Sequence, residues 1–457
     1  MIFKRYQARI AELLRLAIKH DGLRKYGTNM SWLFAEKIFR MLIGFTVGIY
    51  VARQLGPTQY GILNYAISIV AIFSIAAGLG LDSIVVRELV KYPEKRNKIL
   101  GSTFILKLTG FLVMLAGIGI TLYFKNDDQT KNLIILVIAA GYLFQVFQTI
   151  DFYFQSQVLS KYVAISQVVA WVLVSFGRAF CAWKGYPLIY FAWLEAINMG
   201  LMSLGYLFFY MIKISNPFNW HFDFRIAKEL LKNSWPFFLS GATGMIYMRI
   251  DQVMIGSMLG DMEVGYYAVA VRLSEIWYFF PMIISATLLP AIIRSREVSN
   301  AHYMKRLQKY YYFMIWTSIF LCLGMNVVSY HLITILYGNE YAPAVIVLII
   351  YMWELVVMAM GVPFANWIIA ENMQIYALIF SIIGAIVNIV LNYFLIKGIG
   401  INGAAIATVI APLSAFIIVG CLNKRTRQQL YMVIRAFLLV DLFKILLCKR
   451  KAEDFDV

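Results

Sequence analysis

Charged residues are scarce in this sequence of 457 residues, where they make up 14% of the total while apolar residues make up 61%. Soluble globular domains average about 25% charged and about 45–50% apolar residues, so this composition excludes an ordinary soluble protein. Cysteine is also rare: the four cysteines all lie in or beside apolar runs, so no disulfide framework of a secreted protein is expected. The composition instead predicts an all-α protein that crosses a membrane many times.

The groups that several enzyme classes require are missing from the apolar segments. All four histidines lie in loops or at the ends of predicted spans, which leaves no intramembrane histidine for acyl transfer or metal binding. No GxxxxGK[ST] motif occurs, so no nucleotide site is built in. The basic residues are dispersed over many loops, which argues against a nucleic-acid partner despite a net charge of +17. We therefore expect a protein without catalytic residues, metal or cofactor.

Long apolar runs recur along the whole chain. A bilayer core about 30 Å thick needs about 20 mostly apolar residues per helix. Runs of this length, some of them with one to three charges, predict twelve transmembrane helices. They cover residues 29–52, 62–82, 99–124, 131–152, 161–182, 187–212, 232–256, 264–290, 308–332, 342–367, 374–396 and 401–422.

Lysine and arginine follow the arrangement expected for this helix count. With the N-terminus in the cytoplasm, the cytoplasmic segments carry 30 Lys and Arg residues and the opposite loops carry 5. Cytoplasmic loops of membrane proteins are enriched in these residues, and a wrong helix count would invert the later loops and remove the asymmetry. The sequence therefore predicts that both termini are cytoplasmic and that the excess positive charge meets anionic lipid headgroups.

The predicted spans divide the chain into five parts. These are an amphipathic N-terminal segment (1–28), an N-lobe of helices 1–6 (29–212), a cytoplasmic linker (213–231), a C-lobe of helices 7–12 (232–422) and a basic cytoplasmic tail (423–457). Within the tail, residues 429–447 predict an interfacial helix, because charged residues interrupt the apolar run. A thirteenth span over the same residues stays open as the alternative.

A repeat links the two halves. Residues 51–66 (VARQLGPTQYGILNYA) and 255–270 (IGSMLGDMEVGYYAVA) share Leu-Gly, a second Gly five residues later and a final Ala at an offset of 204, and both carry Tyr between that second Gly and the Ala. Because each half has an even number of helices, both halves keep the same orientation, as in transporters built from parallel repeats. We expect two pseudo-symmetric bundles with the substrate site at their interface. The turns 54–61 and 259–265 would form a rim that closes the outer side.

Charges inside the predicted spans are candidate functional groups, because a charge at the bilayer centre costs at least about 2.5–3.5 kcal/mol. They are Glu36, Lys37, Arg40, Lys107, Arg178, Glu195, Arg249, Asp251, Arg272, Glu275 and Glu354. Glu36 and Arg40 at i,i+4 share a helix face, and so do Arg272 and Glu275 at i,i+3. Simple ion pairing is the structural interpretation of these pairs, and snorkelling is that of Lys107 and Arg178. The total nevertheless predicts a water-filled cavity.

The cations and the anions of this set predict different roles. Guanidinium groups bind phosphate bidentately, so the cations indicate a phosphorylated substrate. The predicted substrate-binding residues are Arg40, Arg53 at the outer end of the first span, Lys107, Arg178, Arg249 and Arg272. Carboxylates in a partly dry lobe gain affinity for protons, so Asp251, Glu275 and Glu354 predict ion coupling.

Several segments together carry a family resemblance. They are Gly44–Tyr65, Gly78–Leu89, Ser234–Gly256, Gly265–Pro281, 337–344 (YGNEYAPA) and 400–411 (GINGAAIATVIA). The step Met248-Arg249-Ile250-Asp251, followed by Arg272-Leu273-Ser274-Glu275, is the most specific part. Over essentially its whole length the chain resembles a Wzx-type O-antigen or polysaccharide flippase, in the polysaccharide-transport branch of the MOP exporter superfamily.

This resemblance implies export of an undecaprenyl-pyrophosphate-linked oligosaccharide from the cytoplasmic to the periplasmic leaflet, by alternating access and with H⁺ or Na⁺ as the coupling ion. It also implies a V-shaped pair of lobes in a bacterial inner membrane, with a monomeric chain that meets other polysaccharide-assembly membrane proteins. Three alternatives stay open. A multidrug cation antiporter of the same superfamily should prefer an acidic cavity, a lipid II flippase usually has more helices, and a membrane glycan polymerase or ligase should have a long periplasmic loop.

Overall fold

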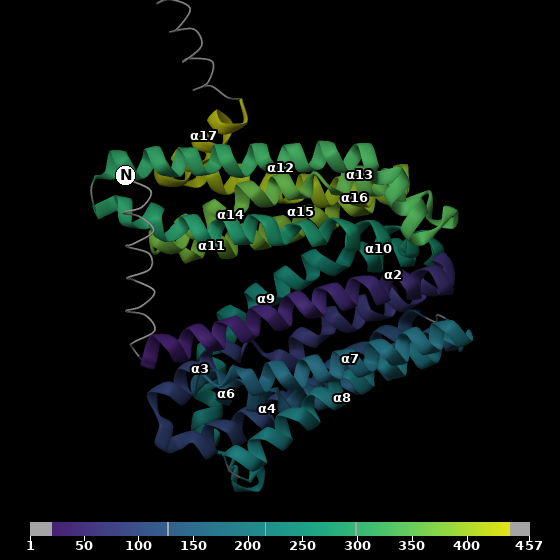
Figure 1. Ribbon diagram of the computed structural model, residues 1–457, viewed down its shortest axis with the longest axis vertical. Helices are drawn as coiled ribbons and strands as arrows, with labels where there is room; N and C mark the ends of the chain where they lie inside the picture. The colour runs from purple at the N-terminus through teal and green to yellow at the C-terminus, as the bar shows by residue number, and fades with distance from the viewer. Residues whose placement is uncertain (1–20, 126–127, 215, 298, 439–457) are drawn as a thin grey trace, which may run out of the picture. The chain divides into compact units, whose positions relative to one another are not determined.

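The structure, a computed structural model, describes residues 21–125, 128–214, 216–297 and 299–438. Within these ranges the chain forms helices joined by short turns and contains no strand (Figure 1). The predicted all-α class is therefore confirmed. Most of the amphipathic N-terminal segment, residues 1–20, lies outside the described residues.

The described residues form two compact units whose boundaries fall inside helices. The first unit comprises Met1–Leu55 and Ile69–Gly241, and the second comprises Gly56–Ser68 and Ala242–Val457, each over its described residues. The short segment Gly56–Ser68 therefore packs with the second half of the sequence. Because the units divide at Gly241, the start of the helix Phe224–Met258 packs with the first half.

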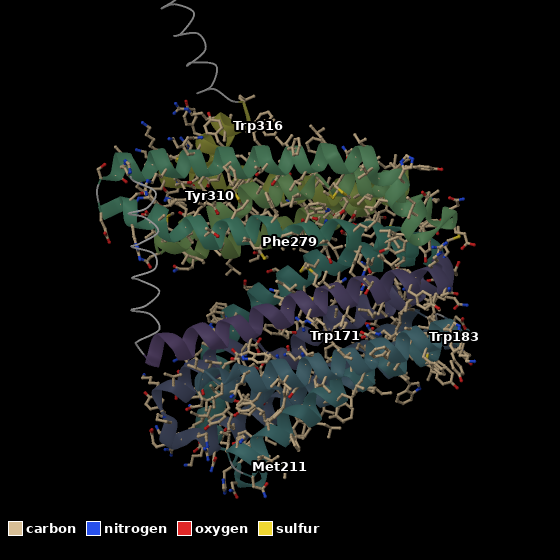
Figure 2. The ribbon with its side chains drawn as sticks, in the orientation of Figure 1. Trp171, Trp183, Met211, Phe279, Tyr310 and Trp316 are labelled. Carbon is tan, nitrogen blue, oxygen red and sulfur yellow. The ribbon has the colours of Figure 1, made fainter. Side chains whose placement is uncertain are left out.

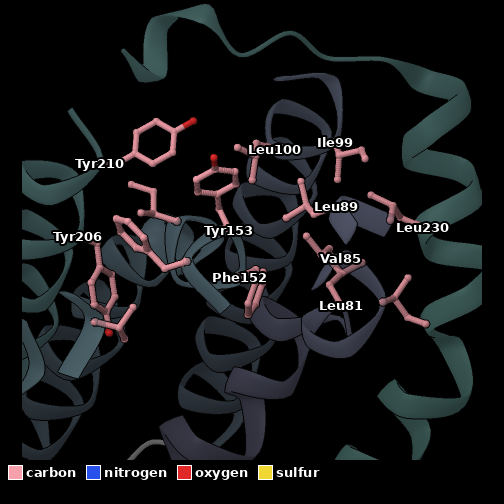
Figure 3. Packing of buried hydrophobic residues seen from close by; sticks show 14 residues of the cluster. Leu81, Val85, Leu89, Ile99, Leu100, Phe152, Tyr153, Tyr206, Tyr210 and Leu230 are labelled. Carbon is pink, nitrogen blue, oxygen red and sulfur yellow. The ribbon is translucent and has the colours of Figure 1, made fainter. Parts of the chain in front are cut away.

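The first unit consists of nearly continuous helices that follow the chain order. They are the parts of α2 (Asp21–Gly78) before residue 56 and after residue 68, and the part of α9 (Phe224–Met258) up to Gly241. Between them come α3 (Asp82–Lys91), α4 (Arg96–Lys125), α5 (Gln129–Gly141), α6 (Thr149–Ser156), α7 (Ser160–Lys184) and α8 (Leu188–Lys213). Short 3₁₀ segments, η1 (Pro93–Lys95), η2 (Tyr142–Gln148) and η3 (Pro217–Asn219), join some of them. A core of buried hydrophobic residues unites α3, α4, α6, α7, α8 and α9 (Figure 3). Leu230 supplies the contribution of α9 to this core.

The chain that leads from α8 into α9 is fixed to α4. The backbone N–H of His221 donates to the carbonyl oxygen of Asn97 at 3.2 Å, and the N–H of Asp223 donates to the Ser102 hydroxyl at 3.0 Å. Gly101 is required here, because a Cβ at this position would lie 2.4 Å from the His221 carbonyl oxygen. The N–H of Ile226 and the ammonium group of Lys98 hold the pKa of the Asp223 carboxyl below its ordinary value. Residues 220–223 of the predicted linker therefore lie against other helices of the first unit.

The second unit contains the remaining helices. They are the Gly56–Ser68 part of α2, the rest of α9, α10 (Asp261–Glu275), α11 (Phe279–Arg294), α12 (Asn300–Tyr337), α13 (Ala344–Tyr351), α14 (Glu354–Ala370), α15 (Gln374–Ile399), α16 (Ile401–Leu422) and α17 (Lys424–Phe437), with 3₁₀ segments η4 (Ile276–Tyr278), η5 (Ser295–Glu297) and η6 (Asn339–Tyr341). Helix α17 begins with a capping box in which Asn423 and Thr426 exchange hydrogen bonds. Its far end lies against α12, where Trp316 Nε1 donates to the Ala436 carbonyl oxygen at 3.0 Å (Figure 2).

The two repeat-related turns pack against each other within the second unit. Gly56 and Gly260 occupy equivalent repeat positions, and both adopt positive φ, at 69° and 113°. A Cβ on Gly61 would lie 1.7 Å from the Asp261 carbonyl oxygen, and a Cβ on Gly265 would lie 2.0 Å from the Pro57 carbonyl oxygen. Since the offset of 204 residues relates Pro57 to Asp261 and Gly61 to Gly265, the two contacts are reciprocal, as across a two-fold axis. The repeat thus explains why glycine is required at both crossing positions.

Ten helical stretches among the described residues are long and apolar enough to cross a membrane. They are Glu36–Lys91, Pro93–Lys125, Gln129–Ser156, Ser160–Lys184, Leu188–Lys213, Asp261–Glu297, Asn300–Tyr337, Ala344–Ala370, Gln374–Ile399 and Ile401–Leu422. The first of these contains most of the first predicted span and the whole of the second, which meet at a kink in α2 at Gly56. The seventh predicted span, 232–256, lies in the more polar α9. The chain is thus a multi-pass membrane protein, and the count of twelve spans stays a prediction.

Reporter fusions test the predicted topology. Truncated chains fused after Gln59, Gly260 or Asn339 should report the outer side, and fusions after Glu94 or Asn219 should report the cytoplasm. Lys and Arg are enriched on the latter side, which is the physical basis of the expectation. A cytoplasmic signal from any of the first three fusions would contradict the twelve-span topology.

Candidate functional site

In the first unit, Arg40 and Arg178 share one tryptophan. Glu36 and Arg40 form the predicted i,i+4 ion pair, with Arg40 Nε 3.2 Å from Glu36 Oε1. The guanidinium carbon of Arg40 lies 5.9 Å from the Trp171 ring centroid, and that of Arg178 lies 5.4 Å from it (Figure 2). Both distances are within the range of cation–π attraction. Trp171 therefore brings two predicted substrate-binding cations into one cluster.

Each arginine of this cluster also has a carboxylate partner. Arg178 Nη2 lies 2.7 Å from Glu195 Oε1, an ion pair that joins α7 to α8. Lys107 lies elsewhere in the unit: its buried ammonium group donates to Gln148 Oε1 at 2.9 Å and interacts electrostatically with Asp82 and Asp151. Because burial and local partners occupy Lys107, a direct role in substrate binding needs a rearrangement. The half-buried Arg40 and Arg178 need none.

In the second unit, Asp251 lies at the centre of a buried polar network. Its Oδ2 accepts hydrogen bonds from the Tyr267 hydroxyl at 2.7 Å and from the Thr408 hydroxyl at 2.6 Å. Its Oδ1 accepts from Asn392 Nδ2 at 2.5 Å, and that same amide nitrogen donates to Asn388 Oδ1 at 3.1 Å. The carboxylate is 3% exposed, and the side chains around it come from α10, α15 and α16. This geometry brings one negative charge and several neutral oxygens to one point.

The network leaves polar atoms without hydrogen-bond partners, as a cation site would. Asn392 Oδ1 and Asn388 Nδ2 are buried and make no hydrogen bond. Buried polar atoms are otherwise almost always paired. The oxygen and nitrogen of an amide have nearly the same shape, so a half-turn of the Asn392 amide would direct its oxygen at Asp251. One carboxylate together with amide and hydroxyl oxygens is a hard-oxygen donor set, which suits an alkali cation such as Na⁺.

A second buried carboxyl group lies in the same unit. Glu354, 9% exposed, is surrounded by tyrosine hydroxyls: Tyr247 at 3.0 Å from Oε1, Tyr278 on Oε2, and Tyr351. Both Glu354 and Tyr278 lie where regular α-helix is interrupted. Tyr278 is the last residue of η4, and Glu354 is the first residue of α14, directly after the break between α13 and α14. Glu354 therefore lies among neutral hydroxyls.

The remaining predicted residues occupy half-buried or exposed positions. Arg272 Nη1 donates to the Tyr60 hydroxyl at 3.2 Å. Glu275 interacts electrostatically with both Arg249 and Arg272, and the interaction with Arg249 is the stronger one. The expected partners Arg272 and Glu275 therefore belong to a group of three charged residues. Arg53 is exposed in the first unit. The half-buried Arg249 and Arg272 leave guanidinium surface accessible.

Sequence reasoning did not include the neutral residues of these networks. Asn388, Asn392 and Thr408 complete the surroundings of Asp251, and Tyr247 and Tyr278 those of Glu354. One signal was present, because two asparagines at i,i+4 inside the apolar span 374–396 are costly unless paired. Nothing in the sequence distinguishes Tyr247 and Tyr278 from the other tyrosines, of which the chain has 29 in all.

Family comparison agrees with this architecture. The family model described as "Polysaccharide biosynthesis protein" matches residues 26–296, which is more than half of the chain, and the MatE model matches residues 236–394. The chain belongs to the polysaccharide biosynthesis protein family. This match confirms the resemblance to polysaccharide flippases that was recognised in the sequence.

Individual relatives and solved structures are similar over most of their length. The chain is 24% identical over 83% of its length to the "Probable low-salt glycan biosynthesis flippase Agl15" of Haloferax volcanii, covering 79% of that protein. It is 22% identical over 85% of its length to the "Capsular polysaccharide biosynthesis protein CapF" of Staphylococcus aureus, covering 97% of it. A structure titled "Lipid II flippase MurJ, inward closed conformation" is 17% identical, with a TM-score of 0.69 and coverages of 90% and 92%. An inward-facing multidrug MATE transporter is also 17% identical, with a TM-score of 0.67 and coverages of 88% and 96%. These structures support the fold.

Proposed function

We propose that this protein flips an undecaprenyl-pyrophosphate-linked oligosaccharide, an O-antigen or related surface polysaccharide unit, from the cytoplasmic to the outer leaflet of a bacterial inner membrane. The chain acts by alternating access and makes or breaks no covalent bond. Its family and the names of its two curated relatives support transport of a lipid-linked glycan.

The observation that carries the proposal is a set of four half-buried guanidinium groups on long helices, three of them in stretches that are long and apolar enough to cross a membrane. Arg40 and Arg178 are half-buried around Trp171, and Arg249 and Arg272 are half-buried around Glu275. Guanidinium groups bind phosphate oxygens through paired N–H donors, and such bonds are strong away from bulk water. Arg40 and Arg178 each have a carboxylate partner, Glu36 and Glu195, so phosphate binding there would exchange one anionic partner for another. Arg249 and Arg272 share Glu275, which leaves an excess of positive charge for an anionic substrate.

The proposed energy source is a cation gradient acting at Asp251. Asp251, Asn388, Asn392 and the Thr408 hydroxyl would hold Na⁺, because they form a buried hard-oxygen donor set with an orphaned amide oxygen. A cation that binds one conformation better than the other shifts their populations by its differential affinity. Coupling is therefore an equilibrium effect at this site.

Reconstituted vesicles test the proposed function. Purified protein should move a fluorescent polyprenyl-pyrophosphate oligosaccharide across the bilayer, and an imposed sodium gradient should change the rate of this movement. A choline gradient of the same size is the control. Movement of the lipid without a response to Na⁺ or to pH would remove ion coupling, whereas absence of movement would contradict the flippase.

A multidrug cation antiporter is the second candidate, and the MatE match over residues 236–394 favours it. The same vesicles distinguish the two functions, because an antiporter should accumulate an organic cation such as ethidium against a gradient. The arginine-rich clusters argue for an anionic substrate, since they repel organic cations.

The arginines of the second unit give a direct prediction. Arg249→Ala and Arg272→Ala should each slow flipping by about tenfold to a hundredfold, because a hydrogen bond to a charged group contributes about 1.5–3 kcal/mol. Lysine at these positions should restore only part of the rate, because it lacks the planar fork. Vesicle flipping at equal protein amounts is the measurement. Arg296→Ala, which removes an exposed ion pair with Glu371, is the matched control and should keep the wild-type rate.

A further inference from the structure

We propose that Glu354 is a resident proton site, separate from the cation site at Asp251, whose carboxylic acid donates a hydrogen bond to Tyr247. The protonation of Glu354 follows from which neighbouring atoms can donate a hydrogen bond and which can only accept one. Neither the family match nor the presence of carboxylates in the spans specifies it.

The Tyr247 hydroxyl has one proton and two oxygen neighbours. Its oxygen lies 2.9 Å from the Thr408 backbone carbonyl oxygen and 3.0 Å from Glu354 Oε1. A carbonyl oxygen has no proton to give, so the Tyr247 proton is directed to Thr408. Glu354 Oε1 then faces a lone pair of the Tyr247 oxygen. These two oxygens form a hydrogen bond only when Glu354 carries a proton.

A proline makes the Thr408 carbonyl depend on Tyr247. In a regular helix the carbonyl of residue 408 would accept from the backbone N–H of residue 412. That residue is Pro412, inside α16, and proline has no N–H. Thr408 is 1% exposed, and a buried carbonyl without a donor costs free energy. The Tyr247 proton therefore has a strong reason to stay on Thr408.

The other oxygen of Glu354 fits the same state. Tyr278 donates to Oε2, and Tyr351 also hydrogen-bonds the carboxyl group. One oxygen accepts while the other donates, as in a carboxylic acid. The N-terminus of α14 would stabilise an ionised Glu354 only weakly, because backbone N–H groups at the α13–α14 junction already have carbonyl partners. The Trp353 N–H donates to the Ile350 carbonyl oxygen at 3.1 Å, and the Leu355 N–H donates to the Met352 carbonyl oxygen at 3.1 Å.

Among the described residues, the titratable groups that interact with Glu354 or with the tyrosines around it are all acids. They are Tyr247 and Asp251 on α9, Tyr267 and Glu275 on α10, Tyr278 in η4 and Tyr351 on α13. A neutral Glu354 avoids a second buried negative charge beside Asp251, since like charges in a low-dielectric interior repel strongly.

Thr408 connects this proton to the proposed cation site. Its hydroxyl donates to Asp251 at 2.6 Å, while its carbonyl accepts from Tyr247. A cation bound at Asp251 would repel the Glu354 proton and favour its release to solvent. This last step rests on the proposed function, whereas the protonation of Glu354 does not.

Infrared spectroscopy of the purified full-length protein in lipid tests the protonation. At neutral pH the spectrum of wild type minus Glu354→Gln should contain the C=O stretch of one protonated carboxyl group. Glutamine is suitable because its amide can donate to Tyr247 and accept from Tyr278, so the variant should fold. The exposed Glu340→Gln is the control and should remove carboxylate bands instead. Loss of carboxylate bands in the Glu354→Gln difference would overturn the proposal.

Pro412→Ala tests the cause. An alanine N–H can occupy the Thr408 carbonyl, which frees the Tyr247 proton for Glu354 and should convert its carboxyl to carboxylate at neutral pH. An unchanged C=O band in a folded Pro412→Ala protein would overturn the role of Pro412. The wild-type and Glu354→Gln spectra decide the protonation whether or not this variant folds.

Sodium separates the proton site from the cation site. Adding NaCl, but not choline chloride, should diminish the Glu354 C=O band in wild type and leave it unchanged in Asp251→Asn. A band that is present and assigned to Glu354 but indifferent to sodium would keep the proton site and contradict its coupling to the cation site. A difference spectrum without the band would overturn the proton site itself.

Discussion

Asp251→Asn should abolish the response of this protein to sodium. Sodium bound only by the folded state stabilises wild type, by about 2.7 kcal/mol when its concentration is a hundred times the Kd. The substitution removes the one negative charge from the donor set of Asn392, Asn388 and Thr408. The thermal midpoint of the variant should therefore be the same in NaCl and in choline chloride. Sodium-driven flipping should fall by about a hundredfold, as expected for an ionic contact of about 3 kcal/mol.

The exposed Glu340→Gln is the matched control for charge removal in the same unit. It should keep both the sodium-dependent thermal shift and the flipping rate. If the Asp251→Asn variant still gained stability from sodium, the cation would bind elsewhere in the chain and the proposed site at Asp251 would be wrong.

Gly265→Ala should disrupt the crossing of the two repeat-related turns. The new methyl group would lie 2.0 Å from the Pro57 carbonyl oxygen, a backbone atom that no rotamer change can remove. Gly61→Ala meets the Asp261 carbonyl oxygen in the same way. Overpacking of this kind costs about 1–3 kcal/mol, and more where backbone must shift. Both variants should lower the thermal midpoint and stop flipping, because the turns can no longer close together.

Gly324→Ala in α12 is the control, since nothing lies within 4 Å of its added methyl group. It should raise stability by up to about 1 kcal/mol, because alanine favours a helix over glycine. The double variant Gly61→Ala/Gly265→Ala should cost less than the sum of the single ones, because separating the turns relieves both clashes at once. Additive costs would show that the two contacts are independent.

The sequence predicted the helices well where the signal was local. Apolar runs marked the spans, and described helices cover most of each one, because about 20 consecutive apolar residues determine a crossing without help from distant parts. The Glu36–Arg40 pair was predicted from its spacing on one helix and is present. The glycine repeat was visible as a pattern, and the residues that it marks do meet. The number of crossings and the cytoplasmic termini stay predictions.

What the sequence alone determined is therefore the membrane class, the helical segments, the internal repeat and the presence of costly charges within the spans. Only the tertiary structure decided how those charges are used. Asp251 meets Asn392 across 141 residues and Thr408 across 157, and Arg178 meets Glu195 on another helix. Such partners depend on the packing of helices, which no local pattern specifies. Even Pro412, plain in the sequence, acquires its effect only because packing places the Tyr247 hydroxyl at the carbonyl that this proline leaves without a donor.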